Sequence, residues 1–122
     1  PYLYMWTSQP WKTQYWVREI MDRMYRPTVD GLCGNDDCGQ MSAWYIFTAM
    51  GFYPVCPGTD QYVLGAPYLP YMKVRVGEGR YLEITYADLK GGAVLEFDMR
   101  STPDKRRCFS AEERPYSLSC EQ

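Results

Sequence analysis

The sequence predicts an α+β fold, in which two helices are followed by three short strands. An amphipathic repeat indicates the first helix over residues 11–25, and an almost uninterrupted apolar run indicates the second over residues 41–50. Beyond residue 70, short segments alternate apolar and polar side chains, which is the period of a strand buried on one face. Helices first and strands last are typical of α+β proteins.

Residues 1–25 should form an extended segment and then a helix. Tyr2, Tyr4 and Trp6 alternate, as they would along one face of an extended stretch. Ser8-Gln9-Pro10 opens the helix, because proline is tolerated in a first turn. Its apolar stripe, which we expect to pack in a core, comprises Val17, Ile20, Met21 and Met24.

A glycine-rich acidic loop, residues 31–40, precedes the second helix. Asp37 stands where an N-cap belongs, and Gln40 three residues later completes a D-x-x-Q capping box. The helix is apolar around its circumference, and Gly51 supplies its C-terminal stop. Protein must cover such a helix on all sides, because about ten residues are too few to span a bilayer.

Capping accounts for only one of the two neighbouring acids in this loop. Asp36 adds a second negative charge beside Asp37, and Gly31, Gly34 and Gly39 indicate an unusual backbone or a close approach to it. A helix dipole favours ionised acids at its N-terminus, so at least one of the pair should have a lowered pKa and be able to act as a base or cation ligand. On spacing alone, helix capping and a functional acid both stay open.

After the second helix, prolines punctuate a connector. Strands are then predicted over residues 72–76, 81–86 and 93–99, with a hairpin turn at 77–80. Their half-polar pattern implies a sheet exposed on one face.

By composition the chain has three parts. Residues 1–58 hold the helices and the acidic loop, 59–100 the connector and strands, and 101–122 a charged tail with little to bury. The 122 residues are one domain's worth, and an aromatic share of 16% points to stacking surfaces or to a larger core. Because no start methionine, signal peptide or transmembrane run is present, we expect the tail of a longer protein.

Charge and residue types narrow the chemistry. The 13 basic and 15 acidic residues are mixed along the chain, which speaks against nucleic acid and membrane partners. Without histidine, Ser-His and Cys-His nucleophiles are excluded, so catalysis would depend on carboxylates. Cys33 and Cys38 flank the acidic loop closely enough for a disulfide, as in an exported protein; ordinary buried and exposed thiols are the alternative.

Four segments carry a resemblance to a known family. They are residues 2–4, 9–14, 51–55 and, most specifically, residues 31–45, which read Gly-Leu-Cys-Gly-Asn-Asp-Asp-Cys-Gly-Gln-Met-Ser-Ala-Trp-Tyr. Together they resemble the C-terminal part of the family 92 glycoside hydrolases, which are calcium-dependent, inverting, exo-acting α-mannosidases. The resemblance is dense to about residue 67 and weaker over residues 91–100.

This resemblance implies the architecture of the parent enzyme, an N-terminal β-sandwich followed by an (α/α)6 catalytic barrel. The two helices would be late helices of that barrel, with residues 1–58 as its end, and a short antiparallel β segment would follow. The apolar second helix would then be covered by barrel helices that are absent from this chain. The chain would be an incomplete part of the enzyme and inactive by itself.

The resemblance also implies site residues. Asp37 matches the general base that activates water during hydrolysis of terminal α-linked mannose, for example the α-1,2 bonds of N-glycans or mannans. Asn35 would orient the water or a sugar hydroxyl, and Asp36 is the third catalytic candidate. The candidate substrate-binding residues are Trp6, Gln40 and Trp44. The general acid, a glutamate of an earlier barrel segment, would lie roughly 6.5–9.5 Å from the base, outside this chain.

Calcium, partners and location follow from the same resemblance. The cofactor would be calcium beneath the reacting mannose, with ligands that we do not assign in this chain. We expect α-mannoside oligosaccharides or glycoproteins as substrates, the rest of the enzyme as partner, and a secreted, periplasmic or cell-surface location in a bacterium. Two departures are Met5, where a polar asparagine is expected, and residues 84–87, where one or two strands are omitted.

Two other functions fit the same residues. A non-catalytic carbohydrate-binding module would stack sugars on Trp6, Trp11, Trp16 or Trp44 and hold calcium in the acidic loop. In a structural or interaction domain, the acids would be caps and the aromatic side chains would be core.

Overall fold

The computed structural model describes residues 1–58, 61–65, 67–77, 79–89, 92–99, 107–109 and 118–119. The chain folds as two compact units, which are described separately. The first comprises Pro1–Tyr68 with Tyr116–Gln122, and the second comprises Leu69–Pro115. No helix of the described residues has the length and apolar character needed to cross a membrane.

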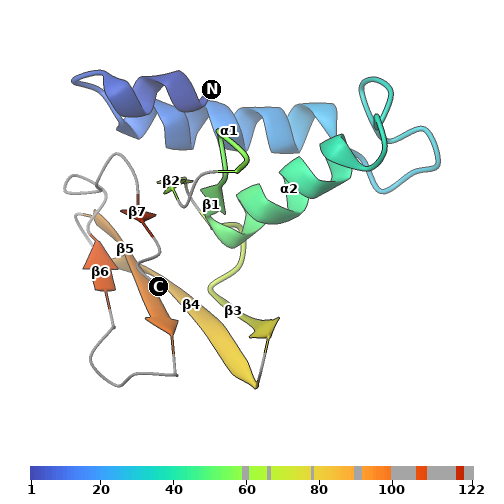
Figure 1. Ribbon diagram of the computed structural model, residues 1–122. Coiled ribbons are helices and arrows are strands. Elements are labelled where there is room, and N and C mark those ends of the chain that lie inside the picture. The colour runs from blue at the N-terminus through green and yellow to red at the C-terminus, as the bar shows by residue number, and fades with distance from the viewer. Residues whose placement is uncertain are drawn as a thin grey trace. The chain divides into compact units, whose positions relative to one another are not determined.

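The first unit combines helices with a small antiparallel sheet (Figure 1). Its helices are the 3₁₀-helix η1 (Tyr2–Trp6), α1 (Trp11–Met24) and α2 (Gln40–Met50). Its strands, in the order β1-β2-β7, are β1 (Phe52–Tyr53), β2 (Gln61–Leu64) and β7 (Leu118–Ser119).

The N-terminal segment differs from the sequence prediction. Residues 2–6 form a 3₁₀-helix, so the extended segment that we inferred from alternating aromatic residues is wrong. In a 3₁₀-helix, residues three apart share a face, and here Tyr2 and Met5 are the buried pair while Trp6 is 55% exposed. Burial of that pair, rather than the alternation of rings, determines the local conformation.

Both predicted α-helices are confirmed within one residue at each end. In the predicted stripe of α1, Val17 and Met21 are buried, whereas Met24 is 49% exposed. Helix α2 ends at Gly51, which has φ 96° and donates its N–H to the carbonyls of Phe47 and Thr48. Thr48 is the one buried residue of α2, all of whose residues are described, and Ile46 is 59% exposed.

The core of the first unit joins η1, α1 and the small sheet. Its buried members are Tyr2, Met5, Val17, Met21 and Val63. Rings and side chains from α2 and β1 pack against them, namely Trp44, Tyr45, Ala49 and Tyr53. The hydroxyls of Tyr2 and Thr48 form a buried hydrogen bond of 2.7 Å, and burial raises the pKa of Tyr2.

The end of the first unit is attached to both helices. The N–H of Tyr68 donates to the carbonyl of Ala49 at 2.8 Å, and its hydroxyl donates to Asp22 at 2.9 Å. Arg18 donates to the carbonyl of Pro67 at 2.8 Å and lies over the Tyr68 ring, 4.2 Å from its centroid. These contacts hold residues 67–68 along α1 and the end of α2.

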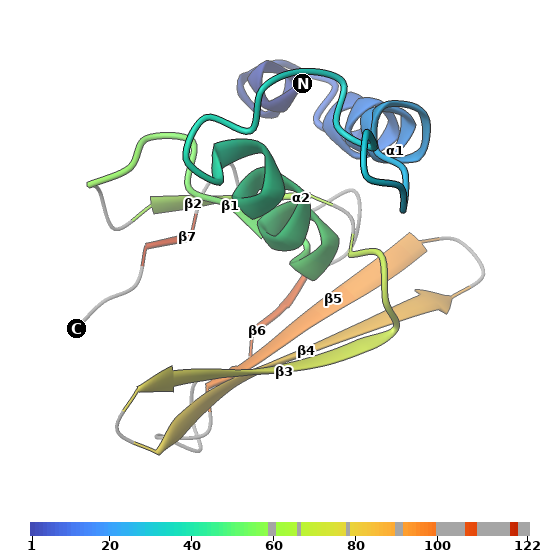
Figure 2. The same cartoon turned by 90° about the vertical axis from the view of Figure 1, so that its right-hand side faces the viewer.

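The second unit is an antiparallel meander in the order β3-β4-β5-β6 (Figure 2). Its strands are β3 (Tyr71–Gly77), β4 (Arg80–Leu89), β5 (Gly92–Met99) and β6 (Arg107–Phe109). The three predicted strands are confirmed, and Gly77 pairs with Arg80 at the predicted hairpin. Strand β4 continues unbroken through residues 84–87, the position of the expected omission.

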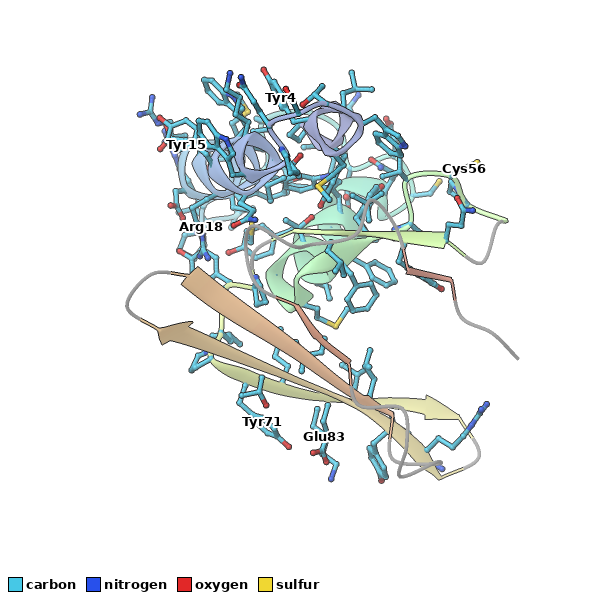
Figure 3. All side chains as sticks on the ribbon, turned by 90° about the vertical axis from the view of Figure 1, so that its left-hand side faces the viewer. Tyr4, Tyr15, Arg18, Cys56, Tyr71 and Glu83 are labelled. Atoms are coloured by element: carbon cyan, nitrogen blue, oxygen red, sulfur yellow. The ribbon has the colours of Figure 1, made fainter. Side chains whose placement is uncertain are left out.

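The first two strands of this meander have one apolar and one polar face. Met72 pairs with Ile84 on the apolar face, and Lys73 pairs with Glu83 on the other, at an Nζ–Oε1 distance of 3.0 Å. Figure 3 shows Tyr71 and Glu83 projecting from the same face. The prediction of a half-exposed sheet is therefore confirmed for residues 71–75 and 81–85, in which Glu83 is the one buried residue of the polar face. Within the predicted tail, residues 107–109 and 118–119 are strands, and the other residues of 101–122 lie outside the described ones.

Candidate active site

A tight turn brings the acidic loop off the end of α1. Tyr25 and Leu32 form an isolated antiparallel bridge, and the N–H of Arg26 donates to the carbonyl of Gly31 at 2.9 Å. A Cβ atom on Gly31 would stand 1.9 Å from the Arg26 carbonyl oxygen and 2.8 Å from that of Thr28. Only glycine fits this position, so Gly31 sets the path by which the loop leaves α1.

The backbone then turns through three successive residues in the left-handed region. Their φ angles are 49° at Asp37, 60° at Cys38 and 88° at Gly39. Gly39 is the N-cap of α2, with no side-chain hydrogen bond to the helix. The predicted capping box is therefore wrong: Asp37 lies two residues before the cap, and Gln40 is the first residue of the helix.

Asp36 caps the helix in place of Asp37. Its Oδ1 accepts the N–H of Ser42 at 2.8 Å, and its Oδ2 accepts the Ser42 hydroxyl at 2.9 Å. These hydrogen bonds, the backbone one first, hold the pKa of Asp36 below its ordinary value. The prediction that one acid of the pair has a lowered pKa is confirmed for Asp36, which is ionised at neutral pH.

Asp37 and Asn35 are open to solvent. Both residues are exposed, and neither side chain has a hydrogen-bond partner in the part of the chain that the structure describes. The Asp37 carboxylate is therefore accessible to a water molecule or a ligand. The two neighbouring acids have different environments, because Asp36 is bonded to Ser42 of the helix and Asp37 is not.

Two of the predicted substrate-binding residues lie on the first turns of α2. Gln40 donates from Nε2 to the hydroxyl of Tyr53 at 3.2 Å. Trp44, four residues later and therefore on the same side of the helix, stacks on Tyr25 with ring centroids 5.6 Å apart and planes 14° apart. The hydroxyl of Tyr25 donates to the Met41 carbonyl at 3.2 Å, which ties the end of α1 to the start of α2.

Trp6 lies away from this group. It ends η1 and stands before α1, whereas the acidic loop follows α1, whose 14 residues span about 21 Å (Figure 1). Among the described residues, no hydrogen bond or ring contact joins Trp6 to the loop. Asn35, Asp36 and Asp37 thus lie on the acidic loop and Gln40 and Trp44 on the first turns of α2 that follow it, whereas Trp6 lies before α1.

Sequence reasoning missed two residues of this site. Ser42 holds Asp36 in place through two hydrogen bonds. The sequence feature that could have indicated this role is that Ser42 is a polar residue at the start of an otherwise apolar helix. Tyr53 holds Gln40, and because it belongs to a two-residue strand 13 positions away, no local pattern indicates that contact.

The described residues form no complete metal site. No group of three or more His, Cys, Asp or Glu side chains gathers among them, whereas calcium takes about six to eight oxygen ligands. Asp36 is committed to Ser42, which leaves Asp37 as the open carboxylate of the loop. Cys33 and Cys38 carry free, exposed thiols, so no disulfide closes the loop in this structure.

Glycosidases typically place two carboxyl groups on opposite sides of the scissile bond, whereas the acidic loop presents one open carboxylate, that of Asp37. Comparison with known families is more specific. The model of the glycosyl hydrolase family 92 catalytic domain matches residues 1–102. The chain therefore belongs to glycosyl hydrolase family 92, which confirms the resemblance seen in the sequence.

Solved structures of family 92 enzymes from Bacteroides thetaiotaomicron are similar to this chain in sequence and in fold. The family GH92 α-mannosidase BT3965 is 48% identical over 73% of this chain, with a TM-score of 0.67, and its complex with mannoimidazole has a TM-score of 0.68. The family GH92 inverting mannosidase BT2199 is 36% identical over 94% of the chain, with a TM-score of 0.66. The chain spans 12% of the first protein and 16% of the second. Comparison with curated proteins finds no match.

Proposed function

We propose that this chain supplies the general base of an enzyme that hydrolyses terminal α-linked mannose with inversion. Membership of family 92 and similarity to solved mannosidases support the reaction. The observation that carries the residue assignment is the contrast between the two acids. Asp36 is fixed by Ser42, whereas Asp37 presents an open carboxylate at the start of α2.

The proposed step uses Asp37 to remove a proton from water. The water oxygen attacks the anomeric carbon as the bond to the leaving oxygen breaks on the opposite side, and a general acid protonates that oxygen. The general acid would be a glutamate from another part of the enzyme. Asn35 would orient the attacking water, and Asp36 would keep the loop in place through its two bonds to Ser42.

Substrate contacts would come from Gln40 and Trp44 near the loop, and from Trp6 if the rest of the enzyme carries sugar to that end of α1. The two helices would belong to an (α/α)6 barrel, whose other helices would cover the exposed side of α2. Calcium would be held by residues beyond this chain, with at most one or two ligands from the loop. A secreted, periplasmic or cell-surface location fits such an enzyme.

The decisive experiment is Asp37→Asn in the complete enzyme. We expect kcat to fall by about 10²- to 10⁴-fold with folding unchanged, because the amide cannot accept the proton. Asp30→Asn is the matched control, since Asp30 is an exposed acid that lies before the acidic loop. NMR of the first product would identify the anomer. Near-normal turnover of Asp37→Asn, or a retained anomeric configuration, would sink the assignment.

A non-catalytic carbohydrate-binding module is the second candidate. Exposed indole rings favour it, with Trp6 55%, Trp11 56% and Trp16 43% exposed. In that case the 122-residue chain should bind α-mannosides, and Trp11→Ala or Trp16→Ala should weaken binding while Asp37→Asn does not. Lack of binding by the chain, with loss of turnover in Asp37→Asn, supports the hydrolase.

A further inference from the structure

The amide of Gln40 is held by a residue to which neither the motif nor the family comparison assigns a role. Gln40 stands three residues after Asp37 and donates from Nε2 to the hydroxyl of Tyr53 at 3.2 Å. This bond leaves the amide oxygen and the second N–H of Gln40 without a partner among the described residues. Two polar groups of Gln40 therefore remain available beside the acidic loop.

Tyr53 is a rigid support for this amide. Its ring stacks on the buried ring of Tyr2, with centroids 5.1 Å apart and planes 11° apart. The backbone of Tyr53 pairs with Val63 in the sheet. A ring fixed on one face and along its backbone keeps its hydroxyl in one place, so Gln40 is oriented by the core.

The available groups match the hydroxyls of a sugar. Each sugar hydroxyl both donates and accepts, while the Gln40 amide oxygen accepts and its remaining N–H donates. We propose that Tyr53 positions the Gln40 amide against a hydroxyl of the sugar next to the reacting bond. This inference rests on the proposed function. Tyr53 is a positioning residue that acts through Gln40 and sets the affinity for substrate.

The test is Tyr53→Phe in the complete enzyme, which keeps the stacked ring and removes only the hydroxyl. We expect KM for an α-mannoside to rise about three- to tenfold with a smaller change in kcat, because one neutral hydrogen bond contributes that much. Gln40→Met removes the amide from an exposed side chain and should raise KM at least as far. In the Gln40→Met background, Tyr53→Phe should have no further effect.

Tyr2→Phe is the matched control, because it removes the hydroxyl of the other ring in the stack, away from Gln40. It should lower stability and leave KM unchanged. A wild-type KM in Tyr53→Phe, or an undiminished effect of Tyr53→Phe in the Gln40→Met background, overturns the inference. If the Asp37→Asn enzyme is active, the proposed function itself fails. If Asp37→Asn is inactive but Tyr53→Phe has a wild-type KM, only this inference is overturned.

Discussion

Asp36 and Ser42 are joined by two hydrogen bonds, in which both carboxylate oxygens of Asp36 accept, one from the backbone N–H of Ser42 at 2.8 Å and one from its hydroxyl at 2.9 Å. This arrangement satisfies an N–H of the first turn of α2, a task usually performed by the N-cap side chain. Because Gly39 occupies the N-cap, the loop reaches back with an acid three residues earlier. The contact separates the structural acid of the pair from the available one.

The first prediction concerns Asp36→Ala, which removes both acceptors. The start of α2 should fray, so the amides of Met41, Ser42 and Ala43 should exchange with deuterium faster than in the wild type. Asp37→Ala should leave their exchange unchanged, since Asp37 does not bond to the helix with its side chain. Equal exchange in the two variants would contradict the structural role of Asp36.

The pH dependence of the same contact has a definite sign. Its hydrogen bonds hold the pKa of Asp36 below the ordinary value of 3.8. An acid whose pKa is lower in the folded state than in the unfolded state stabilises the fold at pH values above its unfolded-state pKa. That contribution is lost as the pH falls through the folded-state pKa. Protection of the amides at the start of α2, taken relative to the intrinsic exchange rate at each pH, should therefore fall as the pH drops below the ordinary value of 3.8. In Asp36→Asn this loss of protection should be reduced; an unchanged profile would show that other acids cause it.

The turn at Gly31 should tolerate no side chain. Gly31→Ala places Cβ 1.9 Å from a backbone oxygen, so the turn must open, and we expect a loss of at least about 2 kcal/mol in unfolding free energy. Gly34→Ala is the matched control, because its nearest neighbour would be the Met41 sulfur at 3.9 Å. Denaturant unfolding of the 122-residue chain would measure both. Similar stability of the two variants would argue against the turn described here.

The buried hydroxyl of Tyr2 needs its partner. Thr48→Val keeps the shape of the side chain but leaves the Tyr2 hydroxyl unpaired, which should cost about 1–3 kcal/mol of stability. Adding Tyr2→Phe should restore part of that loss, because no polar group then remains unsatisfied. The same denaturant unfolding measurement decides the point, and a double variant less stable than Thr48→Val would refute it.

The elements that sequence patterns predicted are those with local signals. Helix α1 has an amphipathic repeat, α2 an apolar run closed by Gly51, and β3 and β4 strict alternation over several residues. Strands β1 and β2 were not predicted, because they are defined by their pairing, of Phe52 with Leu64 and of Tyr53 with Val63, and by the pairing of β2 with β7. Such short segments have no pattern of their own.

At the site, the motif indicated the important loop but not the tasks of its acids. The capping rule selected Asp37 because the rule assumes an ordinary backbone, whereas Asp37 and Cys38 adopt the left-handed region that non-glycine residues rarely enter. Three left-handed residues in succession shift the cap to Gly39 and leave Asp36 facing Ser42. Family resemblance, rather than local rules, selected Asp37 as the base, and Asp37→Asn will test that choice.

The pairing of Tyr2 with Thr48 also constrains the order of events during biosynthesis. The two residues lie 46 positions apart, and at about 5–20 residues per second the ribosome needs roughly 2–9 s to make the intervening chain. Until Thr48 and Tyr53 have been made, the Tyr2 hydroxyl lacks its hydrogen-bond partner and the Tyr2 ring lacks its stacking partner, although Val17 and Met21 of α1 are already present. A pause in translation before residue 53 would prolong that interval.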